Sequence, residues 1–197
     1  MDNRIPTATE SLELITRMIG ETRKQVEKSS HRPFLVWGYT TIVVTLAVWY
    51  AYTATHSNAI FWLWFAIPVV GWFVMWLTRN KEKQQGYVRT PIDRVLSHIW
   101  TVLGVAGLIV TIASFMRPIP VLFIIVLLMG SGSSISGLIL RLQAITVAGC
   151  AGIAFSLLFL IVQGIDQCLI FAAIFLVMMV IPGHIMQYQY SKNQSHV

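Results

Sequence analysis

The chain has 197 residues, of which 56% are hydrophobic and 11% are charged, and its formal net charge is +6. A soluble domain is typically about 45–50% apolar and about 25% charged. The composition therefore excludes a soluble enzyme, a soluble nucleic-acid-binding domain and a disordered chain. It predicts an integral membrane protein.

The first 33 residues are polar and lack the early apolar core and cleavage site of a removable signal peptide. Thr7 and Glu10 have the spacing of a capping box. Apolar side chains then recur at helical spacing, at Leu12, Ile15, Ile19 and Val26. This pattern predicts a cytoplasmic amphipathic helix over residues 9–28, within an N-terminal segment of residues 1–33.

The apolar stripe of this helix is the predicted partner-binding surface. Because the segment carries six basic and five acidic residues, attraction to anionic lipid is weak. We expect the stripe to contact the bundle, another copy of the chain or a protein partner. A helix that merely lies on the inner membrane interface is the alternative.

Six apolar stretches follow, each long enough to cross a bilayer as a helix, which needs about 20 residues. The links between them are short, apart from a basic segment after the second stretch. The sequence predicts an all-α integral membrane fold, a six-helix transmembrane domain over residues 34–187 with a cytoplasmic tail over 188–197. The predicted spans are residues 34–53, 59–78, 95–116, 119–140, 144–165 and 166–187.

The distribution of Lys and Arg predicts the orientation of the spans. Thirteen of the fourteen lie in segments that would share one side of the membrane, and Arg117 alone lies on the other. Basic residues are retained in the cytoplasm, so both termini are predicted to be cytoplasmic, in a bacterial inner membrane. This distribution accounts for the net charge, so we expect no nucleic-acid partner. The lipid bilayer surrounds the chain, and a homo-oligomer or a protein partner remains open.

Short matches indicate that the spans form three related helical hairpins. The first helices align on Gly38, Gly104 and Gly149, and the second helices align on Gly71, Gly137 and Gly183. Chance similarity between apolar segments is the alternative. Small residues let membrane helices approach closely. The predicted packing glycines are Gly104, Gly107, Gly130, Gly137, Gly149, Gly152 and Gly183.

Residues 129–137 form an unusual run of Gly and Ser in the fourth span. Close helix packing is the simpler interpretation, and a polar cavity or gate is the alternative. The residues of that cavity would be Ser131, Ser133, Ser134, Ser136, His184 and His98. Pro182, next to Gly183, is predicted to kink or end the last helix.

No Asp, Glu, Lys or Arg lies in the interior of a span, which disfavours ion-coupled transport. Ser131 and His184 invite comparison with rhomboid proteases, but the first Gly of their G-x-S-G motif is missing. The two side chains are also predicted to differ by about 9 Å in depth. We therefore predict no catalytic, cofactor-binding or metal-binding residue and no cofactor.

Four short motifs resemble a group of six-span membrane proteins of Bacteroides-type bacteria. The motifs are Pro6-Thr7-Ala8-Thr9-Glu10-Ser11-Leu12, Trp37-Gly38, Ser136-Gly137-x-Ile139-Leu140 and Ile181-Pro182-Gly183-His184. The resemblance implies a bundle with no assigned activity, often found beside a small winged-helix regulator. We expect a non-enzymatic interaction or regulatory subunit that acts through its N-terminal helix. A facilitator or binding protein for a small neutral or lipidic molecule is the alternative.

Overall fold

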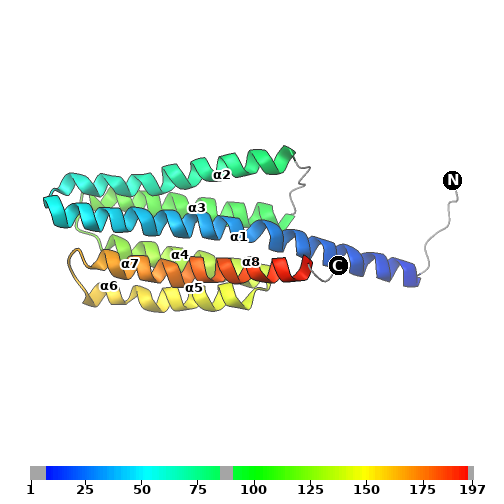
Figure 1. Cartoon of the computed structure of the whole chain (residues 1–197). Coiled ribbons are helices and arrows are strands. Elements are labelled where there is room, and N and C mark those ends of the chain that lie inside the picture. Colours follow the sequence, from blue (N-terminus) through cyan, green and yellow to red (C-terminus); the bar gives the residue numbers. More distant parts are fainter. Residues whose placement is uncertain (1–7, 85–90, 195–197) are drawn as a thin grey trace.

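The computed structural model describes the backbone of residues 8–84 and 91–194, and the side chains of residues 32–78 and 91–188. Within these ranges every regular element is a helix, and the helices pack side by side in one bundle (Figure 1). Six helical stretches of 19 to 24 residues have a mean hydropathy of 1.6 to 2.5. Each is long and apolar enough to cross a membrane. The predicted all-α class with six such helices is confirmed.

The first helix begins and the last helix ends on the same side of the bundle, here called the terminal end (Figure 1). The links after residues 55, 114 and 161 lie at the other end, here called the distal end. The element η1 is a 3₁₀-helix and η2 is a π-helix. The elements are α1 (Ala8–Thr55), η1 (Asn58–Phe65), α2 (Ala66–Gln84), α3 (Pro91–Ser114), α4 (Val121–Leu140), α5 (Gln143–Ser156), α6 (Leu158–Ile161), α7 (Gln167–Phe175), η2 (Leu176–Val180) and α8 (Ile181–Gln194).

Helix α1 is one continuous helix of 48 residues, whereas the sequence predicts a helix over 9–28 and a separate span from residue 34. Pro33 lies inside α1 without ending it. Proline removes one backbone hydrogen bond, but its fixed φ is compatible with a helix. Residues 8–31 lengthen α1 by about 36 Å beyond the span, and Figure 1 shows this part projecting past the other helices.

The link between the fifth and sixth spans differs from the predicted junction at residues 165 and 166. The fifth span ends at Ile161, Val162 is extended, and Gly164 has a φ of +91°. A positive φ is readily adopted only by glycine, so Gly164 permits the turn. The Gln167 side-chain amide donates to the carbonyl groups of Phe159 and Val162. These bonds satisfy backbone groups at the end of α6.

Pro182 does not end the last helix, because α8 continues to Gln194. The five residues before Ile181 form the π-helical turn η2. A proline ring collides with the carbonyl group four residues earlier in a regular α-helix. A π-turn is wider than an α-turn. The wider turn accommodates Pro182, so the predicted ending or kink is replaced by a bulge in a continuous helix.

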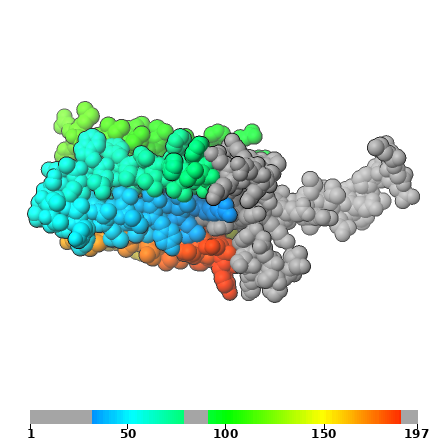
Figure 2. Space-filling view, turned by 45° about the horizontal axis from the view of Figure 1, so that its top comes forward, coloured from blue at the N-terminus to red at the C-terminus, as the bar shows by residue number. Residues whose placement is uncertain are grey.

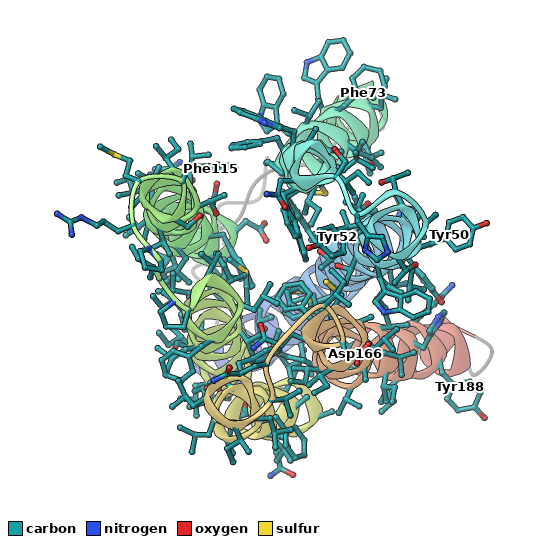
Figure 3. The ribbon with its side chains drawn as sticks, turned by 90° about the vertical axis from the view of Figure 1, so that its left-hand side faces the viewer. Tyr50, Tyr52, Phe73, Phe115, Asp166 and Tyr188 are labelled. Atoms are coloured by element: carbon teal, nitrogen blue, oxygen red, sulfur yellow. The ribbon has the colours of Figure 1, made fainter. Side chains whose placement is uncertain are left out.

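The sixth span is the central helix of the bundle, since 56% of its most apolar window is buried, compared with 6% for the second and third spans. Helix α1 packs on α2 and on the α7–η2–α8 helix, and α4 packs on α3 and α5. The end-on view shows α2 and α3 standing apart at the periphery, on either side of a gap between their ribbons (Figure 3). Two peripheral helices therefore flank a core of the other four spans.

Candidate functional site

The serine run of α4 lies in helix packing. Ser133, Ser134 and Ser136 are 0%, 8% and 1% exposed. Ser134 donates to the Gly130 carbonyl at 2.9 Å, and Ser136 donates to the Gly132 carbonyl at 2.7 Å. Ser136 also accepts a hydrogen bond of 3.1 Å from the Trp100 indole of α3. Ser134 and Ser136 therefore bond within α4 and to α3.

The backbones of α4 and α5 are in direct contact at two glycines. A Cβ atom added to Gly137 would lie 2.5 Å from the backbone nitrogen of Thr146. A Cβ atom added to Gly149 would lie 2.5 Å from the backbone nitrogen of Ser134. Contacts this short leave no room for any side chain at either position.

Four other predicted packing glycines also face a neighbouring helix. The nearest atoms to an added Cβ belong to Ile125 for Gly107, Ile153 for Gly130, Met178 for Gly152 and Leu35 for Gly183. Gly104 is the exception, because an added Cβ would have nothing within 4 Å. Gly104 therefore contacts no neighbouring helix among the described residues, and its packing role stays a prediction.

The structure does not bring His98, His184 and Ser131 together as a cavity or gate. His184 of α8 is exposed and shares a hydrogen bond of 2.7 Å with the Tyr39 hydroxyl of α1. His98 is exposed on α3, which packs on α4. Ser131 donates to the Leu127 carbonyl at 2.8 Å within α4. In the described part of the chain, no three His, Cys, Asp or Glu side chains are grouped as a metal site would require.

Sequence reasoning misses two features. The hydrogen bond between Tyr39 and His184 joins residues 145 positions apart, which no local pattern can indicate. Thr45 is fully buried, and its hydroxyl and that of Ser133 are the buried side-chain groups without a hydrogen-bond partner among the described residues. A threonine in an apolar span is common, so nothing in the sequence distinguishes Thr45.

A cleft of about 700 Å³ lies at the terminal end, between α1, α2 and α8. The space-filling view shows the outer surface of α1 between α2 and the last helices (Figure 2). The lining is mainly apolar, with a guanidinium, a hydroxyl and an amide group at its edge. The lining residues are Arg32, Leu35, Val36, Val74, Leu77, Thr78 and Gln187. The signal for this cleft is weak in the sequence, where Arg32, Thr78 and Gln187 are merely polar residues that flank three spans.

The predicted partner-binding residues Leu12, Ile15, Ile19 and Val26 lie in α1, but their side chains fall outside the described residues. The backbone there is helical, as their spacing predicts. Their contacts stay a prediction.

Comparison with protein-family models, with curated proteins and with solved structures found no match. The resemblance to six-span membrane proteins of Bacteroides-type bacteria therefore stays a prediction from the motifs alone.

Proposed function

We propose that this chain is a multi-pass inner-membrane protein with cytoplasmic termini, acting as a non-enzymatic interaction or regulatory subunit. In this proposal the first half of α1 binds a protein partner. The observation that carries it is the length of α1, whose residues 8–31 extend about 36 Å beyond the first span without a break. A helix of this length standing clear of the bundle offers a surface for a partner.

The continuity of α1 also supports a regulatory role. Within the bundle α1 packs on η1, α2, α7, η2 and α8. A partner that tilts or rotates the projecting half acts through a rigid helix on those contacts, since no loop separates the two halves. The packed serines of α4 also favour this function, because the alternative predicts a cavity lined by those serines.

A photo-crosslinking residue at Ile15 or Ile19 is expected to join the chain to one discrete protein in native membranes. Crosslinking yield at these positions should be at least several-fold higher than at Glu10 or Glu21. The two controls lie on the opposite face of the same helix by register. The products are measured by electrophoresis and identified by mass spectrometry. Equal yields at all four positions, or adducts with lipid alone, would contradict the proposed partner-binding surface.

The second candidate is a binding protein for a lipidic molecule, and the cleft between α1, α2 and α8 is the observation that favours it. Its apolar walls suit an acyl chain, while Arg32 and Gln187 supply N–H donors that suit a phosphate headgroup. The Thr78 hydroxyl donates to the Val74 carbonyl at 2.8 Å. Arg32 is exposed.

Arg32→Gln is expected to weaken the binding of phosphatidylglycerol about five-fold, since one interfacial cation contributes about 1 kcal/mol. Native mass spectrometry of the detergent-purified chain measures the bound lipid. Arg117→Gln removes an exposed cation at the distal end and is the matched control. A preference for phosphatidylcholine, or an equal loss in both variants, would rule out a headgroup site in this cleft.

A further inference from the structure

Helices α8 and α1 pack in a register that two glycines define. A Cβ atom on Gly38 would lie 2.9 Å from a methyl carbon of Val180, three residues before Gly183. A Cβ atom on Gly183 would lie 2.8 Å from a methyl carbon of Leu35, three residues before Gly38. Each glycine therefore contacts the residue three positions before the other.

Helices α4 and α5 pack in the same register. The nearest residue to a Cβ on Gly149 is Ser134, three residues before Gly137. The nearest residue to a Cβ on Gly137 is Thr146, three residues before Gly149. The sequence aligns Gly38 with Gly149 and Gly183 with Gly137. The weak sequence matches thus coincide with equivalent contacts in space, which chance similarity between apolar segments does not explain.

Each of these two glycine-defined helix contacts is here called a junction. A third junction in the same register would join α2 to α3 through Gly71 and Gly104. The same register would place Pro68 against Gly104 and Thr101 against Gly71. In the structure Gly104 has nothing within 4 Å of an added Cβ, and Pro68 and Thr101 are exposed. Gly71 is covered instead by the indole ring of Trp37, 2.8 Å from an added Cβ. The third junction is therefore open.

Helix α2 is anchored at the distal end of this open junction. The Phe115 ring that follows α3 lies 5.1 Å from the Trp62 ring and 6.1 Å from the Phe65 ring. Directly after Phe65 the helix changes from 3₁₀ to α. A change of helix type within a span often marks a hinge. Figure 1 shows α2 diverging from α3 toward the terminal end, as a helix hinged at this point would.

We propose that the three hairpins form a pseudo-threefold ring and that α2 is a hinged arm that closes its third junction. In the closed state Pro68 contacts Gly104 and Thr101 contacts Gly71, and the ring of Trp37 has left Gly71. Closure moves Val74, Leu77 and Thr78 away from α1, so it also opens the cleft that these residues line. The arm is a two-state element built into the fold, independent of which partner or ligand uses it.

Disulfide trapping tests the closed register. The pair Pro68→Cys with Gly104→Cys is placed in a chain with Cys150→Ala and Cys168→Ala, reconstituted in lipid vesicles and oxidised. A disulfide needs Cα atoms within about 7 Å, so closure predicts an intrachain bond. The equivalent pair Gly38→Cys with Val180→Cys should also form, whereas Val69→Cys with Gly104→Cys should form at least several-fold more slowly. If the Gly38 pair forms while the Pro68 pair is no faster than the Val69 pair, or links two chains, closure is overturned.

A distance measurement that leaves both glycines unchanged guards against a variant that folds poorly. Spin labels attached through Trp76→Cys and Val95→Cys, two exposed positions on α2 and α3, report the separation of the helices in the same cysteine-free background. Two distance populations are expected, and Trp37→Ala should enrich the shorter one several-fold. A single population that Trp37→Ala leaves unchanged would refute the hinged arm.

Discussion

Gly149→Val is expected to destabilise the bundle by about 3 kcal/mol. The first added carbon would lie 2.5 Å from the backbone nitrogen of Ser134 and 2.8 Å from the carbonyl oxygen of Gly130. Backbone atoms cannot move aside singly, so α4 and α5 must separate along their shared surface. Helix association in a membrane depends on close van der Waals packing, and separation loses many of those contacts at once.

The free energy of unfolding of Gly149→Val is measured by denaturant titration in detergent micelles. Gly104→Val is the matched control, since it makes the same chemical change where, with the third junction open as in the structure, an added Cβ meets nothing within 4 Å. We expect its unfolding free energy to stay within about 0.5 kcal/mol of the parent. Equal losses in the two variants would show that the close approach of α4 and α5 does not stabilise the fold.

Phe171→Ala is expected to cost about 3 kcal/mol. Phe171 is 2% exposed in the central helix. Its ring centroid lies 4.6 Å from that of Phe175, 5.5 Å from that of Trp64 and 6.2 Å from that of Phe159. The substitution leaves a cavity lined by three aromatic rings, whose dispersion contacts with Phe171 are lost.

Phe73→Ala is the matched control for this variant. Phe73 is 54% exposed, and its ring centroid lies 6.2 Å from that of Trp76. Its side chain projects from the periphery of α2 in the end-on view (Figure 3). The expected loss is below about 1 kcal/mol. Unfolding in detergent compares the two variants, and a larger loss for Phe73→Ala would place the stabilising core elsewhere.

The number and type of the spans could be predicted because both depend on local properties. Each span needs about 20 apolar residues with its backbone hydrogen bonds satisfied inside the helix, and these conditions are visible in the sequence. The points where the helices end do not follow from these conditions alone. Pro182 was expected to end or kink α8, but the π-turn at residues 176–180 accommodates it. Pro33 lies inside a helix that continues on both sides.

The candidate site was harder to predict because its residues meet only through packing. The serines of α4 were expected either to pack or to line a cavity, and the sequence could not decide between the two. Ser136 accepts a hydrogen bond from a tryptophan of α3, 36 residues earlier. His184 pairs with Tyr39 across two helices, and Trp37 covers Gly71. Such contacts depend on which helices become neighbours.

The sequence by itself determined that this chain is helical, that six of its segments can cross a membrane, and which positions hold glycines in related places. These properties follow from composition, length and periodicity. Only the tertiary structure decided that α8 packs on α1 and α4 packs on α5, while α2 stands apart from α3. The same small residue, Gly, lies at a crowded contact at residue 149 and faces open space at residue 104. A glycine permits close approach, but the neighbouring helix must be present to make the contact.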